Sequence, residues 1–296
     1  MSKRRLSAAV AVLALSAATP VLLPATEASA AACSSYPNWV AGKSYATGAI
    51  VRYTDGKAYI AEHDNPGYDP TISTWYWDPY ACDSGSGTPV GSFVVSQTQF
   101  NQMFPNRSSF YSYSGLTAAL SAFPGFATTG DDTTKKREAA AFLANVSHET
   151  GGLVHVVEQN TANYPHYCDT SQWYGCPAGQ AAYYGRGPIQ LSWNFNYKAA
   201  GDALGINLLN DPWLVERDAA VAWKTGLWYW NTQSGPGSMT PHNAMVNGAG
   251  FGQTIRSING SLECDGRNPA QVQSRVSTYQ RFAQILGVDP GGNLYC

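Results

Sequence analysis

The chain has 296 residues, enough for one sizeable hydrophobic core with a smaller unit beside it, or for two modest domains. Its 18 Lys and Arg nearly balance 20 Asp and Glu, and no basic block follows the first five residues, which argues against nucleic acid as a partner. The composition combines 9 Trp, 18 Tyr and 29 Gly with only 13% charged residues. It suits either an aromatic core or a surface for an uncharged polymer such as a polysaccharide.

Residues 1–30 have the pattern of a signal peptide. The basic start MSKRR is followed by an apolar stretch and by Ala-Ser-Ala at 28–30, a small-residue cleavage site. Ser16, Thr19 and Pro20 interrupt the apolar stretch and make it a poor membrane span. We therefore expect cleavage after residue 30 and a secreted, extracellular, soluble mature protein with no membrane partner.

The cysteine content fits an exported protein, in which disulfides are the default. The organisation of the chain favours three pairs: Cys33–Cys82, Cys168–Cys176 and Cys264–Cys296. A zinc site made of Cys168, Cys176 and His166 is the alternative. The spacing lacks a short Cys-x-x-Cys pair, so we expect no metal.

Residues 31–82 are predicted to form a small β domain, and the Ser/Gly/Thr/Pro run DSGSGTPVG at 83–91 is predicted to be a linker. Two short apolar runs, Ile50–Tyr53 and Ala58–Ala61, flank Asp55-Gly56, which is a strong signal for a hairpin turn. A domain this small needs a covalent staple, which a bond between its terminal cysteines would provide.

This small domain holds too many aromatic residues for its core, so some must face solvent, where rings stack on sugars. We assign Trp39, Tyr45 and Tyr53 to the core. The pattern W…KSYATGAIVRYTDGKAYIAEH…GYDP…W over 36–82 resembles the small chitin-binding modules of carbohydrate-binding family 5/12 that are appended to bacterial chitinases. The resemblance implies a chitin-binding platform formed by Tyr68, Trp75 and Trp77.

Residues 92–296 are predicted to be mainly helical. From Thr133, the sequence TTKKREAAAFLANVSHETGG gives one apolar helix face, with Asp132 or Thr133 as the cap and Gly151 as the end. That face comprises Ala139, Phe142, Leu143 and Val146. A second, buried helix is predicted from Asp211-Pro212 through WLVERDAAVAWKTGLWYW, and a short strand at Val154–Val157. We expect an α+β or nearly all-α fold with long loops.

The segment SHETGGLVHVVEQ at 147–159 carries two glutamates, Glu149 and Glu158. A zinc metallopeptidase would need His-Glu-x-x-His, but Gly152 stands where the second His is required, and no Gly-x-Ser-x-Gly nucleophile motif occurs. Glycoside hydrolysis needs two carboxylic acids flanking a bond. Glu149 would lie on the last helical turn, partly removed from water as a general acid requires, and the Gly-Gly turn would bring Glu158 across a cleft. Two solvated surface glutamates are the alternative.

Four motifs in order give this region a resemblance to the family 19 chitinases, the plant-type class also found in actinobacteria. SHETGG resembles the family's His-Glu-Thr-Thr-Gly-Gly, and YYGRGPIQLSWNFNY at 183–197 resembles its Gly-Arg-Gly-Pro-x-Gln-Leu-Ser-x-Asn-x-Asn-Tyr. AWKTGLWYW at 222–230 and SINGSLEC at 257–264 match two further segments. The resemblance spans about 95–296 and implies a lysozyme-like catalytic domain.

The resemblance also implies residue roles. Glu149 would be the general acid, Glu158 the general base, and Ser192 a holder of the attacking water. Residues that would bind the N-acetyl sugars are Gln190, Asn196, Asn259 and Thr150, the last standing for the two threonines of the family motif. Glu263 and Arg275 resemble a charged pair that lies behind the acid and tunes its protonation.

These motifs together predict a monomeric, secreted endochitinase that inverts configuration and requires no cofactor. Its partners would be chitin and chitooligosaccharides. An inverting enzyme separates its carboxyl groups by about 6.5–9.5 Å, which leaves room for water. The short segment between the glutamates predicts an open cleft with few sugar subsites. A muramidase-like peptidoglycan hydrolase and a non-catalytic chitin lectin are the alternatives.

Overall fold

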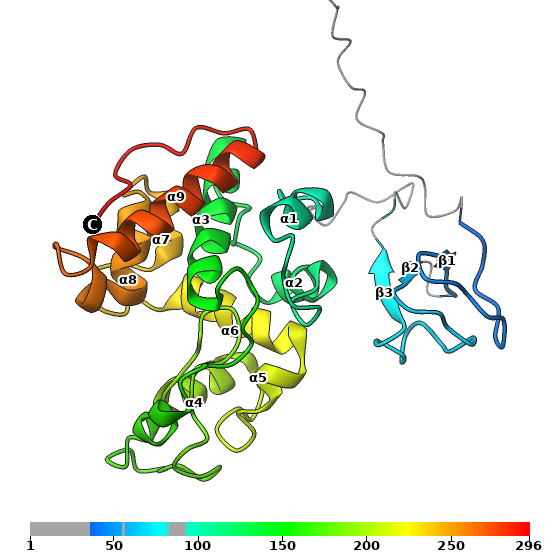
Figure 1. Ribbon diagram of the computed structural model, residues 1–296, viewed down its shortest axis with the longest axis horizontal. Coiled ribbons are helices and arrows are strands. Elements are labelled where there is room, and N and C mark those ends of the chain that lie inside the picture. Colours follow the sequence, from blue (N-terminus) through cyan, green and yellow to red (C-terminus); the bar gives the residue numbers. More distant parts are fainter. Residues whose placement is uncertain (1–35, 55–56, 81, 83–92) are drawn as a thin grey trace, which may run out of the picture. The chain divides into compact units, whose positions relative to one another are not determined.

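The computed structural model describes residues 36–54, 57–80, 82 and 93–296 (Figure 1). The predicted signal peptide at 1–30, the linker at 83–91, the Asp55-Gly56 turn and Cys33 of the Cys33–Cys82 bond lie outside the described residues. The chain divides into two compact units between residues 85 and 86.

The first unit is built on a three-stranded antiparallel sheet in the order β1-β2-β3. Its strands are β1 (Ile50–Arg52), β2 (Ala58–Ala61) and β3 (Trp77–Tyr80). The pairing of β1 with β2, which sets Val51 opposite Tyr59, confirms the predicted hairpin strands. The core assignment is also confirmed, because Tyr45 is buried and Trp39 and Tyr53 pack against the cluster that it forms with four other residues.

The second unit is organised around α3 (Asp132–Thr150), which begins at the N-cap Asp131 and ends at Gly151 in the left-handed conformation. The predicted helix is confirmed, with its cap one residue earlier than expected. All four residues of the predicted apolar face are fully buried. Helix α9 (Pro269–Ile285) packs along α3, and Figure 1 shows the two side by side.

The predicted single helix after Asp211-Pro212 is wrong in its continuity. The chain forms α5 (Leu214–Arg217) and α6 (Ala219–Thr232), separated by Asp218 in an extended conformation. The carboxylate of Asp218 accepts a hydrogen bond from the backbone N–H of Val221 and so begins a new helix, which is the competition with helix continuation expected of Asp.

The strand predicted at Val154–Val157 is also absent as a strand. Of these residues, only Val157 pairs, through an isolated bridge to Arg186. Leu153 just before it has a φ of 62°, in the left-handed region, so the chain enters this segment through a turn rather than in an extended form.

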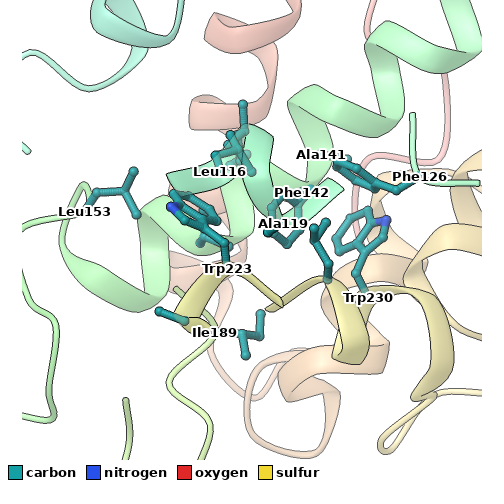
Figure 2. Packing of buried hydrophobic residues seen from close by; sticks show 14 of the residues in the cluster. Leu116, Ala119, Phe126, Ala141, Phe142, Leu153, Ile189, Trp223 and Trp230 are labelled. Atoms are coloured by element: carbon teal, nitrogen blue, oxygen red, sulfur yellow. The ribbon is translucent and has the colours of Figure 1, made fainter. Parts of the chain in front are cut away.

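The other helical segments of the second unit follow in chain order. They are α1 (Gln97–Met103), α2 (Tyr113–Ala119), the 3₁₀ turn η2 (Leu120–Ala122), the 3₁₀ segment η3 (Thr161–Tyr167), α4 (Asn194–Leu204), α7 (Pro241–Val246) and α8 (Phe251–Glu263). Figure 2 shows the core between them, where Phe142 of α3 packs against Trp223 and Trp230 of α6. Among the described residues, no helix is long and apolar enough to span a membrane.

Two predicted disulfides, Cys168–Cys176 and Cys264–Cys296, are present. The first takes both thiols that the alternative zinc site would have used as ligands, so the described structure contradicts that alternative. The second joins the end of α8 to the last residue of the chain, next to Glu263.

Candidate active site

A cleft of about 520 Å³ in the second unit contains most of the predicted site. Six predicted residues line it: Glu149, Glu158, Gln190, Ser192, Asn196 and Asn259. They come from the end of α3, the segment before η3, the loop before α4, α4 itself and α8. The two glutamates therefore face one common space, as two carboxyl groups acting on the same bond must.

Glu149 ends α3 with its side chain 19% exposed and forms an ion pair with Arg275 of α9. The same guanidinium is held by Glu263 of α8, through Nε to Oε2 and Nη2 to Oε1, both at 2.8 Å. Glu263 and Arg275 are almost completely buried. The structure thus places this charged pair behind Glu149.

The surroundings of this ion pair shift the pKa values of Glu263 and His148. Burial alone would raise the pKa of the Glu263 carboxyl, but the hydrogen bonds and charge of Arg275 outweigh burial and hold that pKa below its ordinary value. Burial, reinforced by the charge of Arg275, lowers the pKa of His148. His148 is therefore a neutral neighbour of the pair at neutral pH rather than a second cation.

Asn145, which the sequence did not single out, completes the support of the guanidinium. It is fully buried, its Oδ1 accepts a hydrogen bond from Nη1 of Arg275 at 3.1 Å, and its Nδ2 donates to Oγ1 of Thr254 at 3.0 Å. Asn145 precedes Glu149 by four residues, so both lie on the same face of α3. That spacing is the signal by which it could have been found.

Thr150 was predicted to bind substrate, and the structure contradicts this. It is fully buried, and it does not line the cleft. Its hydroxyl donates to the carbonyl of Val146 at 2.6 Å and accepts from the backbone N–H of Leu153 at 2.7 Å. Thr150 therefore stabilises the turn through Gly151 and Gly152 that follows Glu149.

Glu158 is held from two sides. Its backbone N–H donates to the carbonyl of Gly185 at 2.9 Å, which attaches it to the loop before α4. Its Oε1 accepts from Nδ2 of Asn163 at 2.7 Å and from Oη of Tyr167 at 3.0 Å, both in η3. Neither donor was predicted, because no periodicity or motif marks the segment 159–167.

The loop that carries Gln190 and Ser192 is a tight turn closed by paired backbone bonds between Arg186 and Leu191. Gln190 and Trp193 both have positive φ, 51° and 75°, so the backbone is strained on either side of Ser192. The side-chain amide of Asn196 donates to the carbonyl of Ser192 at 3.0 Å and fixes the loop on α4.

The walls of the cleft also contain residues that were not predicted. These are Tyr167, Ile189, Leu191, Trp193, Tyr229, Ile258 and Leu262, together with backbone at Gly185. All but Tyr167 lie inside the motifs that indicated the family, at positions where the motif itself gave no reason to choose them. The cleft thus combines flat and apolar walls with polar groups, as a site for sugars requires.

In the first unit, the predicted platform is corrected at one position. Tyr68 is 50% and Trp75 is 59% exposed, but Trp77 is 1% exposed. The ring of Trp77 packs edge-on against Tyr45, and its Nε1 donates to the carbonyl of Tyr68. Trp77 is a core residue, because β3 turns this side chain to the inner face of the sheet.

A mainly helical, lysozyme-like unit with two glutamates in one polar cleft has the arrangement of a two-carboxylate glycoside hydrolase. The family model of glycoside hydrolase family 19, chitinase class I, matches residues 94–296. The chain belongs to this family.

Several known proteins are similar to the chain. Endochitinase A of Zea mays is 50% identical over 189 residues, 63% of each protein, so the chain spans less than two thirds of that relative. A crystal structure of a bacterial family 19 chitinase is 80% identical, covers 69% of this chain and all of its own, and has a TM-score of 0.68. A mutant of chitinase C is 64% identical, covers 88% of this chain and all of its own, and has a TM-score of 0.69.

Proposed function

We propose that the chain is a secreted endochitinase that hydrolyses β-1,4 bonds between N-acetylglucosamine units of chitin with inversion. The observation that carries the proposal is that Glu149 and Glu158 line one cleft within the residues that match the family. The cleft residues available to bind N-acetyl sugars are Gln190, Asn196 and Asn259, so chitin and chitooligosaccharides are the proposed substrates.

In this mechanism Glu149 protonates the glycosidic oxygen. Nη2 of Arg275 donates a hydrogen bond to Oε1 of this carboxyl group and so fixes its orientation. Glu263 accepts two hydrogen bonds from the guanidinium and so neutralises much of its charge. Glu263 thereby keeps Arg275 in place, and the guanidinium does not present its full positive charge to the Glu149 carboxyl group.

Glu158 takes a proton from water on the opposite face of the sugar, and Ser192 helps to hold that water. A single displacement of this kind inverts the anomeric centre and needs room for one water between the carboxyl groups. Mechanistically, neither a metal nor an organic cofactor is required.

The activity is tested with Glu149→Gln, which keeps the shape of the side chain and removes its acidic proton. We expect release of reducing ends from chitin to be abolished while binding to chitin persists. Substantial remaining turnover would contradict the assigned acid. Reducing ends measured in parallel from peptidoglycan separate a chitinase from a muramidase, and absence of cleavage of both by the unmodified protein would indicate a lectin.

We further propose that residues 31–82 form a chitin-binding module of the carbohydrate-binding family 5/12 type, joined to the catalytic domain at 92–296 by the linker at 83–91. The exposed rings of Tyr68 and Trp75 support this role. The similarity to chitinase C adds support, because its 88% coverage of the chain exceeds what residues 94–296 alone would supply. Cleavage of the signal peptide after residue 30 would release the protein from the cell.

A further inference from the structure

The hydrogen bonds around Glu158 come mainly from one short element. Within the seven residues of η3, three side chains donate to Glu158: Asn163 and Tyr167 to the carboxylate oxygen Oε1, and Tyr164 to the backbone carbonyl at 2.9 Å. Tyr164 and Tyr167 are three residues apart, so one turn of 3₁₀ helix places both on the same side.

The two oxygens of the Glu158 carboxylate are not equivalent. Oε1 accepts two side-chain hydrogen bonds, at 2.7 Å from Asn163 and 3.0 Å from Tyr167. Oε2 accepts from the backbone N–H of Gly185 at 3.4 Å, which is a much weaker contact. A carboxylate oxygen has two lone-pair sites, so Oε1 is filled and Oε2 has capacity left.

We propose that Asn163 is a positioning residue for the general base, and that Oε2 of Glu158 is the atom that takes the proton from water. This inference rests on the proposed function, in which Glu158 acts as that base. Asn163 and Tyr167 occupy Oε1 and fix the carboxylate plane, so the remaining oxygen is presented to the water.

Tyr167 is able to act as a permanent donor in this arrangement. Burial, together with its hydrogen bond to Glu158, raises the pKa of the Tyr167 phenol to about 12. The phenol therefore keeps its proton throughout the pH range in which a carboxylate serves as a base. Its ring also packs edge-on against Trp193 in the wall of the cleft, which limits its rotation.

The 3₁₀ segment η3, which carries these donors, is held in place by stacked side chains. The ring of Tyr164 stacks on Tyr184 with centroids 3.7 Å apart, and the Arg186 guanidinium lies 3.5 Å from the centroid of the Tyr184 ring on which it packs. Arg186 is fully buried and pairs with Glu216 at 2.6 Å. This stack ties η3 to the same loop that holds the backbone of Glu158, so the donors and the carboxylate share one support.

Loss of a donor to a carboxylate favours its protonated form, in which it is no longer a base. Removal of Asn163 should therefore move the acidic limb of the kcat–pH profile to higher pH. The titratable and charged groups that surround Glu158 remain in place in this variant: Tyr164, Tyr167, Tyr184, Arg186, Glu216 and Glu149.

The test compares Asn163→Leu, which keeps the approximate shape but lacks the donor, with Asn160→Leu as the matched control. Asn160 is exposed at the start of η3 and its side chain makes no capping hydrogen bond. In the full chain acting on soluble chitooligosaccharides, we expect Asn163→Leu to lower kcat roughly tenfold and to shift the acidic limb upward, with KM changed less than about twofold. Tyr167→Phe should shift the limb in the same direction, and Asn160→Leu should match the unmodified enzyme.

An Asn163→Leu variant with unchanged kcat and acidic limb would overturn the inference. The inference would also fail if Asn160→Leu lost as much kcat as Asn163→Leu, because the effect would then be structural. It would fail likewise if Asn163→Leu changed only KM or thermal stability, which would indicate a substrate-binding or structural role. Glu158→Gln is measured beside them. If Glu158→Gln retains activity, the proposed base itself is wrong; if it is inactive while Asn163→Leu behaves as unmodified enzyme, only the positioning role fails.

Discussion

Thr150 shows how a residue can belong to a catalytic motif without touching the cleft. Three consecutive residues after it, Gly151, Gly152 and Leu153, have positive φ. Such a turn leaves backbone groups without helical partners. The Thr150 hydroxyl accepts a hydrogen bond from one of them, the N–H of Leu153, and donates to the carbonyl of Val146 one helical turn earlier in α3.

We expect Thr150→Val, which replaces the hydroxyl by a methyl group of similar size, to lower the free energy of unfolding of the second unit by about 1–3 kcal/mol. The cost arises because the buried N–H of Leu153 loses its acceptor. Thr150→Ser keeps the hydroxyl and should cost clearly less. Urea unfolding of both variants measures the difference, and equal stability of the two would show that the bridge contributes nothing.

At the residue scale, the sequence predicted more of the residues around Glu149, the proposed acid, than of those around Glu158, the proposed base. Glu149 and Glu263 lie in motifs, the resemblance implied Arg275 beside them, and the structure brings the three together; Asn145 follows from helix spacing. Asn163 was not predictable in this way. Its segment has no periodicity, and its approach to Glu158 depends on a three-dimensional stack of rings that separate stretches of the chain contribute.

At the element scale, α6 and the loop of the cleft are in direct contact through Gly226. A Cβ atom at Gly226 would lie 2.9 Å from Cγ of Pro188 and 3.5 Å from Cζ of Phe142. The glycine thus allows α6 to approach both the central helix and the tight turn that carries Gln190 and Ser192.

Gly226→Ala is expected to push this turn away from α6. The overlap should cost about 1–3 kcal/mol of stability and reduce kcat, because Ser192 follows Pro188 by four residues. Gly125→Ala is the control, since its added Cβ would meet only Oγ1 of Thr129, at 3.9 Å. Thermal unfolding and chitooligosaccharide hydrolysis are measured on both; normal activity in Gly226→Ala would mean that the loop tolerates the shift.

Helices α3, α6 and α7 meet at a buried carboxylate, Glu138. It accepts hydrogen bonds from Trp230 of α6 and from the backbone N–H of Ala127, and Nδ1 of His242 of α7 lies 2.6 Å from it. The hydrogen bond with Glu138 raises the pKa of His242 above its ordinary value of 6.5, against the opposing effect of burial.

Because the folded-state pKa of His242 is raised, its stabilising effect is complete below pH 6.5 and is lost as the pH rises through the folded-state value. His242→Leu should therefore lower the thermal midpoint more at about pH 5 than at about pH 8.5. Differential scanning calorimetry at both pH values checks this. A larger loss at the higher pH would contradict the assigned direction.

The elements that the sequence predicted well were those with a strong local signal. The β1–β2 pair followed from its turn dipeptide and α3 from its apolar spacing and terminal glycine. The division between α5 and α6 was missed because the apolar pattern continues across it. Only the capping bond of Asp218, which competes locally with the helix, interrupts the chain there.

At the scale of the whole molecule, the sequence predicted two units with different tasks, and the exposed aromatic residues allow those tasks to be separated. Trp75 of the first unit is 59% exposed, with its ring stacked on Tyr76 and in edge contact with His63. Trp77, two residues later, is buried. Trp75 lies in the turn before β3, whereas Trp77 is the first residue of that strand and contributes to the core, so backbone position rather than residue type decides which ring is available to a ligand.

Trp75→Ala should weaken binding to insoluble chitin about tenfold, the effect of losing roughly 1–2 kcal/mol of ring contact. Hydrolysis of short soluble chitooligosaccharides should remain unchanged, because Glu149, Glu158 and the other residues of the cleft all belong to the second unit.

Trp173→Ala is the matched control, since Trp173 is 88% exposed but lies in the second unit and outside the cleft lining. Pull-down on chitin beads and kinetics on a soluble tetramer are measured on both variants. Unchanged binding in Trp75→Ala would remove this ring from the binding platform, and a loss of tetramer hydrolysis would contradict the separation of binding from catalysis. In the proposed division of tasks, anchoring by the first unit would raise the effective concentration of an insoluble polymer near the cleft without adding any contact inside it.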